Sequence, residues 1–188
     1  MARATRPRGP VDPDPPPAQD PRKQRMTERQ IRLFGDPVLK TVSSEIHEID
    51  DGVRALVEDL LDSVRPDGRA GVAAAQIGVN LRAFSYNVGP AFGYVLNPVI
   101  EELRGEAVLV DEGCLSVPGL WFPTMRHPEA VITGIDLEGK PVRIEGTGVL
   151  AQAFQHEVDH LDGLVYLDRL DKQRRREAMK QVRESDWF

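Results

Sequence analysis

Two histidines stand four residues apart in this sequence, and a glutamate follows the first of them. They form the pattern His-Glu-x-x-His at His156, Glu157 and His160. On a helix, residues four apart lie one turn apart and project from the same face. Two imidazoles so arranged can bind one metal ion, and the adjacent carboxylate can accept a proton from a water molecule on that metal. The alternative is a surface helix with two unrelated histidines.

A catalytic zinc or iron site built on two histidines needs a third protein ligand and keeps one position open for water. The sequence contains a single cysteine, Cys114. A lone cysteine is more commonly a small buried apolar residue than a ligand, but Gly113 before it indicates a turn that presents the thiol. Because a thiolate with two imidazoles suits Zn²⁺ or Fe²⁺, we expect Cys114, His156 and His160 to bind a metal.

A helix must carry the two histidines, and the run from Val149 to Phe154 before them contains no glycine or proline. Gly163 is placed to end this helix. An earlier helix is predicted after a cap at Asp50 or Asp51, and it stops at Pro66-Asp67-Gly68. Its apolar side chains recur at helical spacing and define one buried stripe: Val53, Leu56, Val57, Leu60, Leu61 and Val64.

Short apolar segments elsewhere predict strands. They cover residues 81–86, 94–97, 108–110, 131–137 and 142–145, and the last two flank a predicted hairpin turn. A further helix is predicted over Asp168 to Phe188. Strands that precede a metal-binding helix indicate an α+β fold, with small antiparallel strands packed around a central helix that carries the His-Glu-x-x-His motif.

Three short motifs in a fixed order make this sequence resemble the peptide deformylase family. Glu-Gly-Cys-Leu-Ser is complete at residues 112–116, and Gln-His-Glu-x-Asp-His is complete at residues 155–160. Gly-x-Gly-x-Ala-Ala-x-Gln corresponds to residues 69–76, with Arg69 in place of its first glycine. The resemblance runs from about Ile31 to Leu170. It implies an enzyme that removes the formyl group from the N-terminal formyl-methionine of new polypeptides.

The resemblance also implies roles at the reacting group. Glu157 would take a proton from the attacking water and return it to the departing amine. The side-chain amide of Gln76 and the backbone N–H of Leu115 would stabilise the oxyanion. The metal would be Fe²⁺, with Zn²⁺, Ni²⁺ or Co²⁺ as substitutes, and the substrates would be nascent formyl-Met polypeptides.

Substrate-binding residues can be predicted from position along the chain. Val149 and Ala153 lie on the helix face of His156, and Val110 leads into the cysteine segment, so these three are expected to line a pocket for methionine. Core packing would explain them equally well. Gly71 and Val72 are expected to contact an extended substrate, with the Gly71 main chain pairing as in strand addition.

Arg69 is the one departure from the family motifs. Glycine is needed at that position only if the backbone takes a positive φ or another group approaches too closely for a Cβ. Gly68 precedes it and can take the demanding turn. We therefore expect Arg69 to adopt an ordinary conformation and to extend into solvent at the rim of the cleft.

The net charge of −6 is distributed unevenly along the chain. Residues 1–26 hold 7 of the 15 prolines and a net charge of +3, so we expect a disordered, proline-rich tail before a single catalytic domain at 27–188. Residues 168–188 carry +2, and residues 27–165 carry −11. Basic ends of this kind are usually solvated; a weak contact with the ribosome is the alternative. No specific DNA contact is expected.

The cellular compartment is predicted from cysteine usage and from the apolar runs. A single cysteine excludes an intrachain disulfide, which is typical of the reducing cytoplasm. The N-terminal arginines are not followed by an apolar stretch, so no secretory signal is expected. No apolar run approaches the roughly 18 residues of a membrane helix. We therefore expect a cytoplasmic protein without a membrane partner.

Two other classes of protein share part of this pattern. A zinc endopeptidase also uses His-Glu-x-x-His but usually takes its third ligand from a downstream His or Glu, and no histidine follows His160 here. A non-catalytic, deformylase-like binding protein is the second alternative. Binding alone does not require both Glu157 and Gln76, so their presence favours an enzyme.

Overall fold

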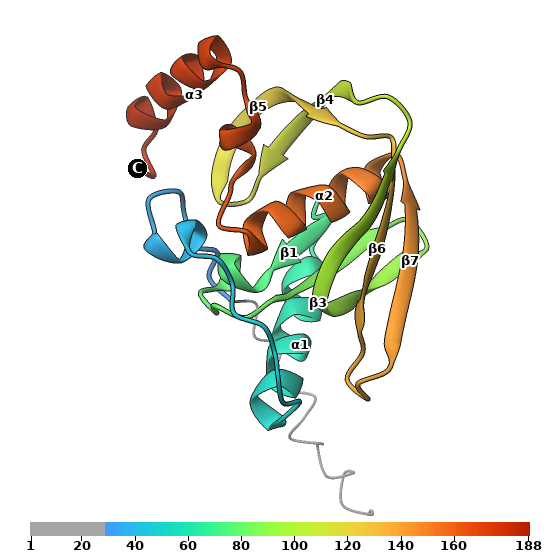
Figure 1. Ribbon diagram of the computed structural model, residues 1–188. Coiled ribbons are helices and arrows are strands. Elements are labelled where there is room, and N and C mark those ends of the chain that lie inside the picture. Colours follow the sequence, from blue (N-terminus) through green and yellow to red (C-terminus); the bar gives the residue numbers. More distant parts are fainter. Residues whose placement is uncertain (1–28) are drawn as a thin grey trace, which may run out of the picture.

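The computed structural model describes residues 29–188 (Figure 1). The predicted disordered tail at 1–26 lies outside the described residues. Within residues 29–188, helices combine with two antiparallel sheets, so the fold is α+β as predicted. No helix of the described part is long and apolar enough to cross a membrane.

The larger sheet has five strands in the order β1-β2-β3-β6-β7, and every neighbouring pair is antiparallel. The strands are β1 (Gly71–Ala73), β2 (Ala83–Val88), β3 (Ala91–Arg104), β6 (Glu129–Ile135) and β7 (Pro141–Thr147). The predicted hairpin is present between β6 and β7. Its turn is closed by Asp136, whose carboxylate accepts hydrogen bonds from the backbone N–H groups of Glu138 and Lys140.

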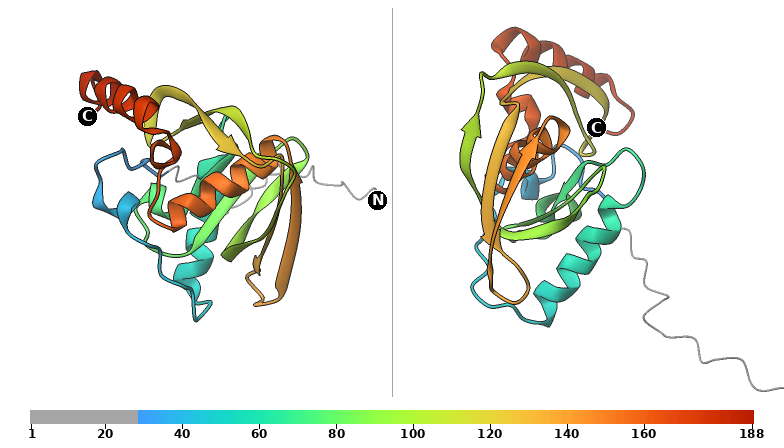
Figure 2. Two further views of the ribbon diagram at one scale, coloured as in Figure 1. Left: turned by 45° about the horizontal axis from the view of Figure 1, so that its top comes forward. Right: turned by 90° about the vertical axis from the view of Figure 1, so that its right-hand side faces the viewer.

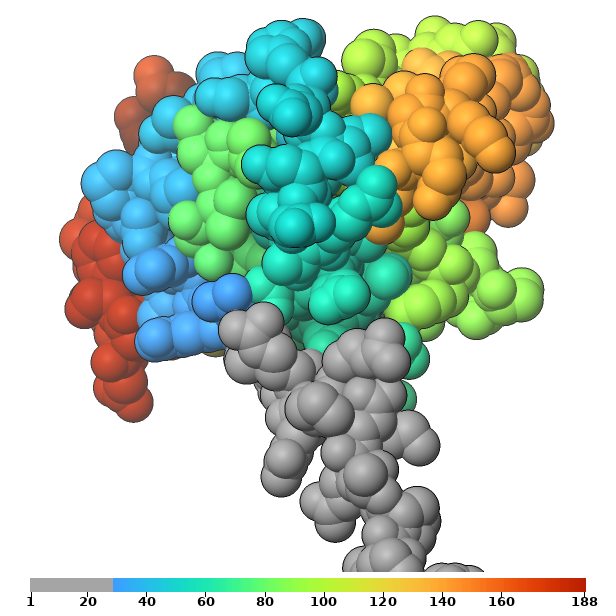
Figure 3. Space-filling view, turned by 90° about the horizontal axis from the view of Figure 1, so that it is seen from below, coloured from blue at the N-terminus to red at the C-terminus, as the bar shows by residue number. Residues whose placement is uncertain are grey.

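Helix α1 (Asp51–Val64) forms as its apolar spacing and cap predict. The Asp50 carboxylate accepts a hydrogen bond from the Val53 backbone N–H at 2.8 Å, which satisfies one donor of the first turn. The apolar stripe packs on β1, β2 and β3, and the Ser85 hydroxyl donates to the Leu60 carbonyl across this contact. Figure 3 shows α1 over the middle of the lower face, beside the orange β6–β7 hairpin.

Helix α2 (Val149–Leu161) carries the His-Glu-x-x-His motif and contacts all five strands of the larger sheet. Figures 1 and 2 show it between this sheet and the β4–β5 ribbon. A helix buried on nearly every side must satisfy its polar side chains. Gln155 does so with three hydrogen bonds: its amide donates to the carbonyls of His127 and Ala151, and its oxygen accepts from the His127 N–H.

The second sheet is a ribbon of two strands, β4 (Val108–Cys114) and β5 (Val117–Arg126). Strand β5 was not predicted from the sequence, and the turn predicted at Gly113 lies instead at residues 115–116. The reason is that β5 contains Pro118, Gly119 and Pro123, which argue against a strand in a sequence. A two-stranded ribbon accommodates prolines because each strand has one unpaired edge.

The C-terminal segment is not the single helix predicted for residues 168–188. A short 3₁₀ helix η4 (Tyr166–Arg169) comes first, and helix α3 (Lys172–Glu184) follows. Asp171 separates them because its carboxylate accepts from the N–H groups of Gln173 and Arg174 and so begins a new helix. Two other 3₁₀ helices are η2 (Pro37–Lys40) and η3 (Ala74–Ile77).

Candidate metal centre and active-site cavity

The structure brings the three predicted metal ligands together. One ligand atom from each of Cys114, His156 and His160 can be chosen so that all lie within 4.8 Å of one another. The Cys114 Sγ atom lies 3.2 Å from His160 Nε2. The two imidazoles come from adjacent turns of α2, and the thiol comes from the end of β4. One thiolate and two imidazoles form the donor set that Zn²⁺ and Fe²⁺ accept.

A buried carboxylate fixes the orientation of His156. Its Nδ1 atom lies 2.7 Å from Glu112 Oε1, so a neutral imidazole that donates there keeps the Nε2 lone pair for a metal. Burial raises the pKa of Glu112, but hydrogen bonds from Arg126 and His156 outweigh it and hold the pKa at about 2. Glu112 is therefore ionised at neutral pH and accepts hydrogen bonds with both oxygens.

The negative charge of Glu112 belongs to a buried ionic network. Arg126 donates to Glu112 at 2.8 and 2.6 Å and to Asp159 at 2.8 Å. Asp159 also accepts two hydrogen bonds from Arg169, at 3.1 and 2.5 Å. Burial of these charges is costly unless each is paired and hydrogen-bonded. The network joins β4, β5, α2 and η4 directly behind the two histidines.

Glu157 lies beside the candidate ligands with only 2% of its surface exposed. Its Oε2 atom has no hydrogen-bond partner within residues 29–188. Burial raises the pKa of this carboxyl to about 7, against the opposing charge of His156. A Cβ added to Gly71 would stand 2.5 Å from Glu157 Oε1, so the chain needs glycine there to admit the carboxylate.

Gln76, on η3, has its side-chain amide directed at the cysteine. Its oxygen accepts from the Ala73 N–H at 2.8 Å, and its Nε2 atom lies 3.5 Å from Cys114 Sγ and 3.4 Å from Ser116 Oγ. The hydrogen bond to Ala73 decides which end of the amide is the donor toward the cavity. Leu115 follows Cys114 in the turn and also lines the cavity.

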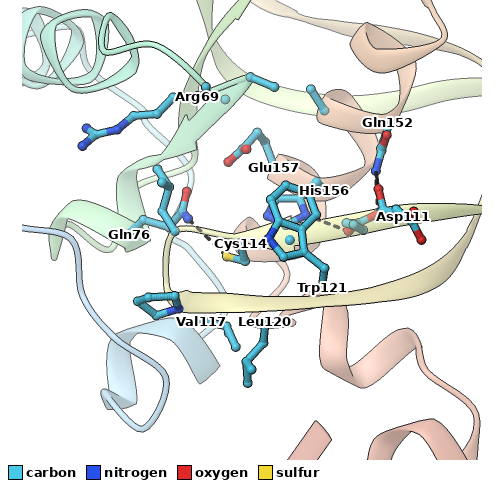
Figure 4. Close-up of a pocket in the computed structure, with 18 of the residues that line it drawn as sticks. Arg69, Gln76, Asp111, Cys114, Val117, Leu120, Trp121, Gln152, His156 and Glu157 are labelled. Atoms are coloured by element: carbon cyan, nitrogen blue, oxygen red, sulfur yellow. Dashed lines mark hydrogen bonds and ion pairs between the residues drawn. The ribbon is translucent and has the colours of Figure 1, made fainter. Parts of the chain in front are cut away.

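A cavity of about 560 Å³ opens in front of these groups (Figure 4). Six predicted catalytic and substrate-binding residues line it: Gly71, Gln76, Leu115, Val149, Ala153 and Glu157. Cys114 and His156 lie at its floor, and His160 is fully buried behind them. A cavity of this size accommodates a methionine side chain with part of a peptide.

Two predicted substrate-binding residues lie outside the cavity. Val72 follows Gly71 in β1, and because side chains alternate along a strand it points into the core beneath α1. Val110 pairs with Thr124 in the β4–β5 ribbon, and the lining on β4 begins one residue later, at Asp111. Spacing along the sequence could not distinguish these neighbours.

Arg69 lines the cavity, in agreement with the predicted place at its rim, but its side chain differs from the prediction. Gly68 has a φ of +84° and makes the demanding turn, and Arg69 has no positive φ, both as expected. The Arg69 side chain, however, donates to the Ser63 carbonyl at the end of α1, at 2.6 Å, instead of extending into solvent. The carbonyls of the last helical turn are unsatisfied within the helix, which explains the attraction of a guanidinium.

Several residues of the site were missed by sequence reasoning. Trp121 and Leu120 on β5 line the cavity, as do Asp111 and Gln152. The β5 residues were missed with the strand itself. Arg126 was missed because an isolated arginine carries no local sign that it will be buried. The sequence did contain a signal for a buried cation: Glu112 in the cysteine motif and Asp159 in the histidine motif each require a cationic partner if they are buried.

An α+β fold with a Cys/His/His group at the floor of a peptide-sized cavity defines a metal-dependent hydrolase. Residues 28–176 match the polypeptide deformylase family, and the chain belongs to that family. This family removes the N-formyl group from nascent polypeptides and depends on a bound metal. The chain is 47% identical over 164 residues to a peptide deformylase of Parafrankia sp. (strain EAN1pec), covering 86% of this chain and 89% of the relative.

Solved structures of the same family share the fold. Peptide deformylase from Legionella pneumophila superposes with a TM-score of 0.78 at 30% identity, covering 84% of this chain and 95% of that one. Peptide deformylase from Ehrlichia chaffeensis in complex with actinonin superposes with a TM-score of 0.77 at 32% identity, covering 84% and 97%.

Proposed function

We propose that Cys114, His156 and His160 hold one divalent metal ion, Fe²⁺ in the cell, with Zn²⁺, Ni²⁺ or Co²⁺ as substitutes. The observation that carries the proposal is the convergence of one thiol and two imidazoles within 4.8 Å at the floor of the cavity. His160 is fully buried with its Nε2 atom beside Cys114 Sγ, which fits two ligands of one bound cation. When bound, such a metal supplies a Lewis acid that lowers the pKa of water and polarises a carbonyl.

Glu157 is the proposed carrier of protons in deformylation. Its carboxylate reaches the cavity beside His156, and its Oε2 atom has no hydrogen-bond partner within residues 29–188. It takes the proton of the attacking water and later gives it to the departing amine of methionine. Gly71 permits this position because it has no side chain to occupy the same space.

Gln76 and Leu115 are the proposed donors to the formyl oxygen. The Gln76 amide is fixed by its hydrogen bond to Ala73, so its Nε2 donor is aimed at the Cys114 side of the cavity before substrate arrives. The Leu115 backbone N–H lies next to the same cysteine. Loss of one preorganised donor of this kind typically raises a reaction barrier by about 3–4 kcal/mol.

Val149 and Ala153 are proposed to contact the methionine side chain. They lie on the cavity side of α2, and Val149 is more than half exposed in the described chain. A substrate that covers them removes apolar surface from water. The substrate backbone pairs with the main chain at Gly71, on the β1 edge of the five-stranded sheet.

We further propose that residues 27–188 act as one catalytic domain in the cytoplasm and that residues 1–26 are dispensable for chemistry. The basic side chains on α3 favour a weak contact with the ribosome, where formylated chains emerge. A protein that starts at Met26 should keep its activity on short peptides and its melting temperature.

The test combines anaerobic metal analysis with an assay on formyl-Met peptides. Cys114→Ser should lose most of its metal, because a serine hydroxyl is a poor ligand at neutral pH. Glu157→Ala should keep its metal and lose about 10²- to 10⁴-fold in kcat. Glu138→Ala, at the exposed β6–β7 turn, is the control and should change neither measurement.

Results opposite to these expectations would test the roles of Cys114 and Glu157 one at a time. Full metal occupancy and activity in Cys114→Ser would return the cysteine to a packing role, and near-normal hydrolysis by Glu157→Ala would exclude it as the proton carrier. Actinonin, which occupies the Ehrlichia structure, should compete with substrate for the cavity.

A further inference from the structure

A large aromatic side chain stands exposed at the mouth of the cavity. Trp121 lines the cavity and keeps 68% of its surface in water. Figure 4 shows its ring in front of His156. The ring also rests on the backbone of Gly113, where an added Cβ would come within 2.8 Å of the ring atoms Cδ2 and Cε2. Trp121 is thus supported on one side and open to solvent on the other.

The exposed apolar surface continues from Trp121 along one face of the β4–β5 ribbon. Gly113 pairs with Trp121, Asp111 with Pro123, and Leu109 with Met125. Residues directly opposite in an antiparallel pair share a face, so these six form one track, defined here as the outer face. Leu109 and Met125 are 48% and 50% exposed. From Trp121 to Met125 the track is about 13 Å long, at about 3.3 Å per strand residue.

Single exposed apolar residues are normal on protein surfaces, but a row of three that begins at a catalytic cavity is a different case. We propose that the outer face binds the residues that follow formyl-methionine in the substrate, with Trp121 as the first contact. This inference rests on the proposed function, because it takes the Cys114 end of the cavity as the site of the formyl group.

Three observations favour the substrate chain as the occupant. The track starts one residue before Cys114, so a peptide that leaves the cavity reaches Trp121 first. Its length matches about four extended residues. Its few side chains provide far less than the roughly 800 Å² per partner that a stable dimer buries. A second copy of this chain is therefore the weaker occupant.

The outer face also predicts a sequence preference. A planar indole stacks on aromatic side chains, and such pairs contribute beyond simple burial. Asp111, exposed between Leu109 and Gly113, repels acidic side chains. We therefore expect formyl-Met peptides with phenylalanine at the second or third position to react best, those with serine less well, and those with aspartate least.

The experiment measures kcat/KM for formyl-Met peptides that carry Phe, Ser or Asp at position two, and then at position three. The wild-type protein should prefer Phe over Ser by about three- to tenfold at one of these positions. Trp121→Ala should abolish this ratio, and Trp121→Phe should restore most of it. Phe92→Ala, an exposed aromatic residue outside the cavity, is the matched control and should keep the wild-type ratio.

Three outcomes would overturn the inference. The first is a wild-type protein without the Phe preference, and the second is a Trp121→Ala variant that keeps it. The third is a Trp121→Ala variant that changes from dimer to monomer in sedimentation while its Phe-over-Ser ratio of kcat/KM stays unchanged. The last outcome would identify the outer face as an interface between copies. If Trp121→Ala fails to fold, the Phe-over-Ser ratios of kcat/KM for Trp121→Phe and Trp121→Leu are compared instead: the inference requires Trp121→Phe to keep the preference and Trp121→Leu to lose it. Failure of the proposed function would instead appear as full activity in Cys114→Ser.

Discussion

The two faces of the β4–β5 ribbon differ in a way that inverts the usual pattern. A sheet with one solvated face normally places apolar side chains inward and polar ones outward. Here the inner face holds Glu112 and Arg126, both buried, next to Phe122 and Thr124. The outer face exposes Trp121, Leu109 and Met125 to water. The inversion runs along the ribbon, from Arg126 and Met125 at one end to Trp121 beside the Cys114 end.

Stability alone explains neither face. Buried ion pairs often contribute less than well-packed apolar residues would, since both charges lose their hydration. Exposed apolar side chains gain nothing from the hydrophobic effect until something covers them. Both features make sense if the inner face orients His156 through Glu112 and the outer face receives substrate. Under these proposals, the inner face positions a candidate metal ligand and the outer face binds the substrate chain.

The largest effect is expected on the inner face, from Arg126→Met. This change removes the cation that pairs with Glu112 and Asp159 and leaves two carboxylates buried. Breaking a buried pair in this way typically costs about 3–5 kcal/mol. Urea unfolding of the metal-free protein should show a corresponding fall in the free energy of unfolding.

Arg104→Met is the matched control for this prediction. Arg104 also pairs with two carboxylates, Glu102 and Glu145, but on the surface. Exposed pairs of this kind contribute little, so the unfolding midpoint should stay close to that of the wild type. Equal midpoints for the Arg104 and Arg126 variants would mean that the buried network is not needed for stability.

The next effect concerns Glu112→Gln, which tests how the inner face acts on the metal site. The amide keeps the shape of the side chain but removes the charge that faces His156 and Arg126. Changes to such supporting groups typically lower metal affinity about 10- to 100-fold. Competition with a chelator measures this directly. The control is Asp111→Asn: Asp111 precedes Glu112 on β4 but lies on the outer face, so this change should leave metal affinity unchanged.

The elements around the site could not all be predicted equally well from the sequence. Local patterns were sufficient for α1, for the β6–β7 hairpin and for the helix under the histidines, because caps, turns and helical spacing act within a few residues. They were insufficient for β5, because its prolines are typical of loops and turns. Register decides which side chains face inward, and register was invisible without the strand.

In the candidate site, too, some residues could be predicted from local sequence patterns and others depend on how distant segments pair. Metal chemistry dictates residue types and spacing, so Cys114, His156 and His160 could be selected from sequence, and the structure brings them together. The partnership of Glu112 with Arg126 arises from cross-strand geometry over 14 residues and has no local signature. The break between η4 and α3 was also missed, since Asp171 reads equally well as a helix interior residue or as a cap.

A smaller effect is expected from Arg69→Gly, on the β1 side of the cavity. Gly68 already supplies the positive φ, so a second glycine relieves no strain. The change does remove the hydrogen bond to Ser63 that ties this loop to α1. We expect kcat/KM to change by less than about tenfold, equivalent to roughly 1.4 kcal/mol. A much larger rise in activity would show that the arginine distorts the loop that presents Gln76.

The smallest effect is expected on the outer face, from the double change of Leu109 and Met125 to threonine. Both side chains are already about half exposed, and threonine keeps a favourable strand conformation. The free energy of unfolding should therefore change by less than about 0.5 kcal/mol. Phe122→Ala, in the neighbouring inner-face row, is the contrast: it opens a cavity in the core and should cost about 3–5 kcal/mol. A loss above about 2 kcal/mol for the double variant, varying with protein concentration, would mean that a second copy covers the outer face in solution.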